Sequence, residues 1–417
     1  MGRLWIARCA LVALAFVQCR EEQPSAAPQS AASASALPSP PPAPTASAVA
    51  VDRASLPCGD ALLGADASPG EIDDLSMSHM TGDRVFVSAT SFAAKRTVAY
   101  VVAPGGATRV GTIGTMPSRT IAGHGDVVVA EAHRTTLCKA GASVQIPADP
   151  QGRGDWLVTS FVDDHTLVSV YAETISHGPP CRRLTGGTRV VKRIFVDAVD
   201  LDAPQPTWKT VSSHAVPAPS GAACRSSIPI AAAATADRAL VVLESCVQID
   251  AGDSISSQHC SLAAERLATG TWERFAMPGE RQDFVTPVAA RDGERVAFET
   301  AQASGAFVVY RLEHGAFVAE GPARDGDPLA IEGTHLLRID ARGTHPGPSG
   351  LGFRVFADEL AGGAWRSASD ALETTSRAWA FDTSGPAPFA AVADEHATSF
   401  RVATVRAGRW VVEATVP

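Results

Sequence analysis

Short apolar runs separated by turn residues occupy most of the chain from residue 83 onward. The runs are five to eight residues long and rich in Val, Phe and Thr, as in RVFVSAT, TLVSVYA, ALVVLES and AFVVYRL. Gly, Asp and Pro punctuate them, and no long segment with the periodicity of a capped helix interrupts them. Runs of this length and composition are typical of β-strands, so the pattern predicts an all-β fold.

The strand-like runs recur with a period. A turn followed by a large aromatic residue occurs at intervals of 64, 45, 48 and 45 residues, at Trp208, Trp272, Phe317, Trp365 and Trp410. About 45 to 50 residues holding four strands is typical of one blade of a β-propeller, in which stacked sheets cover one another's faces. Each aromatic residue is therefore expected to pack between neighbouring blades.

The period predicts seven blades of four antiparallel strands. Because the second predicted blade is short, a total of six or eight blades remains an alternative. A pair of β-sandwiches is a further alternative, which the equal spacing disfavours. The expected blades are 72–114, 118–147, 155–213, 227–277, 283–320, 327–368 and 376–417. In periodicity the chain resembles bacterial WD40-like or sialidase-type propellers. It lacks the WD dipeptide, and LAGGAWRS and LATGTWER lack the Ser and Asp of an aspartate box.

The first 19 residues have the pattern of an export leader. Arg3 and Arg8 precede the apolar stretch CALVALAFV, which is too short for the roughly 20 residues of a membrane span. The stretch ends at Cys19, and in this respect it resembles a bacterial lipoprotein signal. The resemblance implies that Cys19 is lipidated and becomes the mature N-terminus. Gln18 departs from the Gly or Ala of that family, and cleavage in the following Ala/Ser run, or an uncleaved anchor, stays open.

Residues 20–50 are dominated by Pro, Ala, Ser and Gln. Such a segment has too little large apolar area to offset the entropy of ordering, so it is expected to be a disordered, semi-rigid tether. Residues 51–417 then form a single propeller domain. The leader and tether predict an exported, monomeric protein of the cell envelope that meets the membrane only through its lipid anchor, or is secreted.

Six cysteines follow the leader, and an even number in an exported chain favours disulfides. Cys246 ends one predicted strand and Cys260 begins the next, so these two are expected to bridge a hairpin. By elimination and nearness, two further pairs follow, Cys181 with Cys224 and Cys58 with Cys138. Six free buried thiols are the alternative.

Composition and motifs exclude several functions. A formal charge of −9 disfavours nucleic-acid binding, which needs a basic face. No GxSxG, HExxH or phosphate loop is present, so no catalytic residue, metal site or cofactor is predicted. The polar groups Asp163-Asp164-His165 and Asp73-Asp74 are interpreted as turn chemistry, with cation binding as the alternative for Asp73-Asp74. Arg182, Arg183 and Arg193 are interpreted as solvated loop residues.

The long predicted connections are 174–188, 248–259 and 343–352, together with 213–228 between two blades. Insertions gathered on one face of a repeat fold often mark a binding face. The leading hypothesis is therefore a non-enzymatic propeller that binds an unknown protein or glycan partner through these loops. The alternative is an exported hydrolase or lyase that acts on glycans with carboxylates around a central channel.

Overall fold

The computed structural model describes the chain from residue 70 to its end, with gaps. The gaps are 81, 115–119, 125–126, 132–134, 140–141, 147–154, 162–164, 177–188, 218–224, 236, 250–256, 279–286, 300–305, 341–351, 376–377 and 395. Between 110 and 164 only the backbone of the strands is described. The predicted leader and tether lie outside the described residues, and the described ranges contain no helix suited to crossing a membrane.

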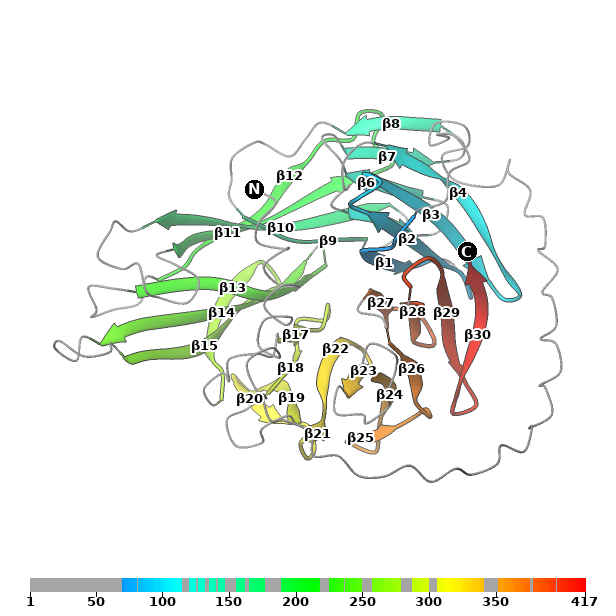
Figure 1. Ribbon diagram of the computed structural model, residues 1–417. Coiled ribbons are helices and arrows are strands. Elements are labelled where there is room, and N and C mark those ends of the chain that lie inside the picture. The colour runs from blue at the N-terminus through cyan, green and yellow to red at the C-terminus, as the bar shows by residue number, and fades with distance from the viewer. Residues whose placement is uncertain are drawn as a thin grey trace, which may run out of the picture. The chain divides into compact units, whose positions relative to one another are not determined.

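All regular elements in the described ranges are strands, which confirms the predicted all-β class (Figure 1). The N-terminal strands are β1 (Asp74–His79), β2 (Val85–Ser91), β3 (Arg96–Ala103), β4 (Gly106–Gly114), β5 (Thr120–His124), β6 (Val127–Glu131), β7 (Thr135–Lys139) and β8 (Ala142–Ile146). Strands β1 to β4 form one antiparallel sheet and β5 to β8 form another, so the short second repeat has a full set of four strands.

The middle of the chain forms one sheet of eight strands. Its strands are β9 (Asp155–Phe161), β10 (Thr166–Ser176), β11 (Arg189–Asp200), β12 (Lys209–Ala215), β13 (Arg225–Ala234), β14 (Arg238–Ile249), β15 (Ser257–Ala268) and β16 (Thr271–Ala276). The sequence predicted two separate blades here. They are joined because Val190 of β11 and Ser227 of β13 form a single parallel pair.

Three more sheets complete the described chain. The first holds β17 (Val288–Ala289), β18 (Arg295–Glu299), β19 (Ala306–Glu313), β20 (Ala316–Ala319) and β21 (Arg324–Asp325). The second holds β22 (Asp327–Glu332), β23 (His335–Asp340), β24 (Phe353–Ala361), β25 (Ala364–Ser367) and β26 (Leu372–Thr374). The last holds β27 (Trp379–Asp382), β28 (Phe389–Ala393), β29 (Phe400–Arg406) and β30 (Arg409–Val416).

Where side chains are described, the middle strands of a four-strand group are more buried than its outer strand, which meets solvent. β2 is buried along its whole length, including its polar residues Ser88, Thr90 and Ser91, and β28 is a continuous apolar run that is also buried throughout. The outer strands β12 and β16 alternate exposed and half-buried positions. A sheet that packs on a neighbour on each side needs apolar residues in both directions, which explains why the central runs do not alternate.

The aromatic residues that open the outer strands pack on the preceding group of strands, as the repeat predicted. Trp272 of β16 lies against β10 and β11, and Phe317 of β20 joins the cluster of β14 and β15. Trp365 of β25 packs on β18 and β19, and Trp410 of β30 packs on β23 and β24. Each ring therefore fills the space between consecutive sheets, where large buried aromatics contribute most.

The first and last sheets of the described chain share one hydrophobic cluster. Val87 of β2 and Tyr100 of β3 belong to it together with Phe389 of β28 and Phe400 of β29. The rings of Tyr100 and Phe400 meet edge to face with their centroids 5.4 Å apart. The N-terminal sheet is thus packed on the C-terminal one, although the two are about 300 residues apart in sequence.

Candidate functional site

A cavity of about 200 Å³ lies among the first strands of four groups, β13, β17, β22 and β27. Five alanines line it, and their small side chains leave the space that larger residues would fill. Its polar side chains come from the turns that follow these strands or from the last residue of a strand: Arg291, Glu332, Asp382, Thr383 and Ser384. The cavity therefore combines small apolar side chains with a few convergent polar groups, as ligand sites do.

Glu332 ends β22 and is held by one hydrogen bond. Its Oε2 accepts the main-chain N–H of Arg291 at 3.0 Å, and the residue lines the cavity. Burial raises the pKa of the Glu332 carboxyl. The hydrogen bond from the Arg291 amide and the charge of Arg291 lower this pKa, whereas the charges of Asp292 and Asp382 raise it. A carboxyl with a raised pKa keeps its proton at a higher pH than an ordinary carboxyl does. Such a group beside a cavity is suited to general acid catalysis.

Asp382 ends β27 and is 5% exposed. Its Oδ2 accepts the main-chain N–H of His79 at 3.1 Å. Its Oδ1 accepts the N–H of Ser384 at 2.8 Å and the Ser384 hydroxyl at 2.7 Å. Three donors therefore hold the two carboxyl oxygens of Asp382 in place.

The turn that holds Asp382 is fixed by close packing. A Cβ added at Gly385 would lie 2.5 Å from the Nδ1 and Cε1 atoms of the His79 ring, so only glycine allows this approach. The same ring lies 6.3 Å from the ring of Phe389. The main chain of His79 and the turn after β27 therefore hold Asp382 from two sides.

Glu332 and Asp382 form an unequal pair of carboxyl groups. The charge of Asp382 is one cause of the raised pKa of Glu332, so ionisation of the second group is penalised by the first. A carboxyl with a raised pKa and a second carboxyl in the same cavity can serve as an acid and a charge stabiliser. Such pairs are the ordinary machinery of glycoside cleavage.

A second cavity, of about 260 Å³, is lined by His335, Asp358 and Glu359 and by residues of the β27–β28 and β29–β30 turns. Its buried carboxylate, Asp358, is already paired with Arg324 and Arg338 at 2.8 and 2.9 Å. A carboxylate that two guanidinium groups hold has a structural role, so this cavity does not offer the same chemistry.

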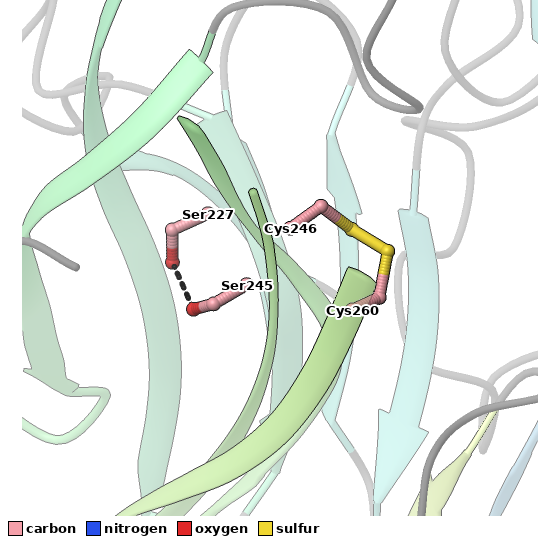
Figure 2. The surroundings of a disulfide bond; sticks show 4 residues. All are labelled: Ser227, Ser245, Cys246 and Cys260. Carbon is pink, nitrogen blue, oxygen red and sulfur yellow. Dashed lines mark hydrogen bonds between the residues drawn. A yellow bond between two sulfur atoms is a disulfide. The ribbon is translucent and has the colours of Figure 1, made fainter. Parts of the chain in front are cut away.

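The structure brings together one of the predicted cysteine pairs. Cys246 and Cys260 lie directly opposite each other in the register of β14 and β15 and form a disulfide (Figure 2). Beside them, the hydroxyl of Ser245 donates to that of Ser227 at 3.3 Å and links β14 to β13. Cys58, Cys181 and Cys224 lie outside the described residues, and the side chain of Cys138 is not described.

Among the described residues, one group has the spacing of a metal site, namely Glu244 with Cys246 and Cys260. Both sulfurs are joined to each other in the disulfide. Because a metal needs the thiolate form of cysteine, this group does not offer a metal site in its oxidised state.

The other polar residues singled out in the sequence do not line the cavity. The exposed Asp73 accepts the N–H of Phe92, 19 residues later, at 2.6 Å, and His165 forms an ion pair with Asp202. Arg193 on β11 places its guanidinium 5.9 Å from the ring centre of Phe195. Asp163, Asp164, Arg182 and Arg183 lie outside the described residues.

Asp74 begins β1, and burial raises the pKa of its carboxyl from 3.8 to about 6. A hydrogen bond from the Leu75 N–H lowers this pKa, and the charge of Asp73 raises it. Between these pH values the folded chain keeps a proton that the unfolded chain has lost. The free energy of unfolding contributed by Asp74 therefore falls as the pH rises from about 4 to about 6.

Asp74→Asn is expected to remove this dependence. At pH 7.5 the variant should be more stable than the parent by up to about 3 kcal/mol, and at pH 4 the two should be equal. Urea unfolding at both pH values measures this, with Asp73→Asn on the exposed neighbour as the matched control, expected to change stability by less than about 0.5 kcal/mol. Equal stability of Asp74→Asn and the parent at pH 7.5 would contradict the assignment.

Sequence reasoning missed Arg291, Glu332 and Asp382. In the sequence they stand in ARDGE, IEGTH and FDTSG, which read as ordinary turns. The available signal was positional, because Glu332 and Asp382 each end the first strand of a repeat and Arg291 follows such a strand. In a repeat fold, equivalent positions lie on one face, so polar residues there converge.

No family model matches the chain, and no curated protein resembles it in sequence. Solved structures do resemble its fold. The β-propeller domain of the Trilobed protease from Pyrococcus furiosus matches with a TM-score of 0.45 and 10% identity, over 82% of this chain and 98% of that one.

Two longer proteins match as well. A puromycin hydrolase mutant complexed with PGG matches with a TM-score of 0.48 and 14% identity, over 87% of this chain and 55% of that one. The acylaminoacyl peptidase of Pyrococcus horikoshii matches with a TM-score of 0.44 and 9% identity, over 82% and 52%. The chain thus spans about half the length of these two proteins, and identities this low concern the fold alone.

The prediction of a non-enzymatic propeller that binds a partner through its long loops is corrected by these comparisons. The similar structures include a propeller domain of a protease, a hydrolase and a peptidase. The cavity with its two carboxyl groups lies at short turns such as β22–β23 and β27–β28.

Proposed function

We propose that the chain is an exported hydrolase or lyase that cleaves glycans in the cavity bounded by β13, β17, β22 and β27. The observation that carries the proposal is Glu332, a carboxyl with a raised pKa that lines the same cavity as Asp382. A hydrolase or lyase with carboxylates around a central channel is the alternative that the sequence indicates, and in this proposal Glu332 and Asp382 are two such carboxylates.

In the hydrolytic form of the reaction, Glu332 enters protonated and donates that proton to the leaving glycosidic oxygen as the C–O bond breaks. Positive charge develops at the anomeric carbon, and the negative charge of Asp382 stabilises it. A water molecule adds to the anomeric carbon, and its proton returns to Glu332. The products are two hydroxyl-bearing sugars, and the enzyme ends in its starting protonation state.

Glu332→Gln tests the assignment, because glutamine keeps the acceptor for the Arg291 N–H and removes the transferable proton. Loss of a general acid costs about 100- to 10,000-fold in rate. The full-length protein should release reducing ends from a panel of neutral and acidic polysaccharides, and Glu332→Gln should lose that activity by this factor. In the parent, the rate should fall as the pH rises above the raised pKa of Glu332.

Glu294→Gln is the matched control. Glu294 ends the turn that Arg291 begins, it pairs at 3.8 Å or more with the guanidinium groups of Arg266 and Arg311, and it does not line the cavity. This variant should keep the parental rate. The proposal fails if the folded parent cleaves none of the polysaccharides, or if Glu332→Gln and Glu294→Gln are equally active.

The finer architecture and the location belong to the same proposal. We count seven blades, with the eight-stranded sheet as two blades joined at Val190 and Ser227. Cys19 carries the lipid, residues 20–50 form the tether, and residues 51–417 form the catalytic domain. Its partner is then a polymer of the cell envelope or its surroundings. Mass spectrometry of the membrane-extracted protein tests this part, since an unmodified N-terminus at Met1 would contradict it.

A further inference from the structure

Arg291 occupies a rigid position at the cavity. It follows β17 and opens the turn to β18, in which the Gly293 N–H donates to Ala290 O at 3.1 Å and the Glu294 N–H donates to Asp292 Oδ1 at 2.8 Å. The main-chain N–H of Arg291 is itself fixed on Glu332. The base of the side chain is therefore held in place while the half-buried side chain lines the cavity.

The guanidinium of Arg291 differs from those around it. Arg295, four residues later, forms ion pairs with Glu320 and Asp292 at 3.0 Å. Arg324 and Arg338 form ion pairs with Asp358. No described residue forms an ion pair or hydrogen bond with the guanidinium of Arg291. Its charge nevertheless reaches the cavity, because it lowers the pKa of Glu332 against the effect of burial.

A guanidinium offers a planar fork of donors that matches carboxylate and sulfate groups. We infer that Arg291 is an anion subsite beside Glu332, so that the sugar bound in the cavity carries a carboxylate or a sulfate group. This inference rests on the proposed function and names its substrate class, an acidic glycan. The Thr383 side chain and the alanines of the cavity remain for the uncharged part of the ring.

An acidic sugar also fits the chemistry of Glu332. An anion bound at Arg291 neutralises the positive charge that lowers the pKa of Glu332, so the proton stays on the carboxyl at higher pH. A neutral sugar leaves that charge in place. The substrate charge and the protonated acid therefore support each other, and the pH limit of activity should lie higher with acidic than with neutral glycans.

Binding to the full-length protein tests the inference, by calorimetry or NMR titration with glucuronate, glucose 6-sulfate and glucose. At least one acidic sugar should bind more tightly than glucose, and Arg291→Gln should weaken it about 10- to 100-fold, the cost of losing a charge-assisted pair. The affinity of Arg291→Lys for that acidic sugar should lie between those of the parent and Arg291→Gln. The relative affinities of glucuronate and glucose 6-sulfate decide between carboxylate and sulfate.

Arg366→Gln is the control, because Arg366 is an exposed arginine on β25 that does not line the cavity. It should bind as the parent does, and all variants should keep the parental melting temperature. Equal binding of glucose and both acidic sugars, or no effect of Arg291→Gln, would overturn the inference. These outcomes are separable from the proposed function, which is decided by the turnover of Glu332→Gln and not by affinity.

Discussion

Replacing Asp358 with asparagine is expected to lower the free energy of unfolding by about 3 to 5 kcal/mol. The Asp358 side chain is fully buried on β24. Arg324 forms an ion pair with it through Nη2 at 2.8 Å and donates to it through Nε at 3.1 Å, and Arg338 donates through Nε at 2.9 Å. Asparagine would leave two largely buried guanidinium groups without a counter-charge, and the cost of desolvating them would fall on the folded state.

The network around Asp358 also joins two sheets. Arg324 lies on β21, which pairs with β19, and its Nη1 donates to Trp365 O at 3.0 Å. Arg338 lies on β23, donates to Asp325 O at 3.2 Å, and stacks 4.4 Å from the ring centre of Phe356. Loss of the central charge should therefore loosen the contact between these sheets as well as the local pairs.

Asp340→Asn is the matched control for Asp358→Asn. Asp340 lies in the same sheet and pairs with the partly exposed Arg354 at 2.7 Å. Water screens such a pair, so its loss should cost no more than about 1 kcal/mol. Urea unfolding of the full-length variants measures both values. Similar midpoints for the two variants would show that the buried network contributes no more than a surface pair.

Gly326→Ala is expected to cost about 4 kcal/mol. Gly326 joins β21 to β22 with a φ of +93°, which residues with a Cβ rarely adopt. An added Cβ would also overlap the carbonyl oxygen of Ile339 on the paired strand β23. A backbone atom cannot move aside as a side chain can, so β22 would have to shift away from β23.

The same substitution at the other end of β22 separates conformation from overlap. Gly333 has a φ of +53°, and an added Cβ there would meet nothing within 4 Å. Gly333→Ala should therefore cost only about 1 kcal/mol, the strain of the left-handed conformation alone. Thermal and urea unfolding check both variants. A loss at position 326 no larger than that at position 333 would mean that the overlap is relieved without cost.

Both sensitive positions lie in or beside the sheet that carries Glu332. Gly326 precedes β22, the strand that Glu332 ends, and Asp358 anchors the sheet to its neighbour. Because Glu332 receives its hydrogen bond from Arg291 on the adjacent sheet, a small movement between the two sheets would change the protonation of the candidate acid. Stability and the candidate chemistry are therefore coupled through the same packing.

Local patterns determined the all-β class and the repeat. Runs of five to eight apolar residues identify strands because a strand covered on both faces needs apolar residues along its length. The spacing of Trp272, Phe317, Trp365 and Trp410 predicted their packing on the preceding sheet because each occupies the same place in its repeat. The Cys246–Cys260 pair could be predicted for a related reason, since a hairpin brings the two facing ends of consecutive strands together.

Only the tertiary structure decided the site. Arg291, Glu332 and Asp382 come from three sheets and lie 41 and 50 residues apart in sequence, so no short motif joins them. Whether a turn carboxylate is an ordinary solvated group or an acid with a raised pKa depends on burial and on neighbouring charges, which the fold supplies. Sequence determined which segments become strands and how they repeat. The arrangement of the first strands around one cavity determined which of many similar turn residues face each other.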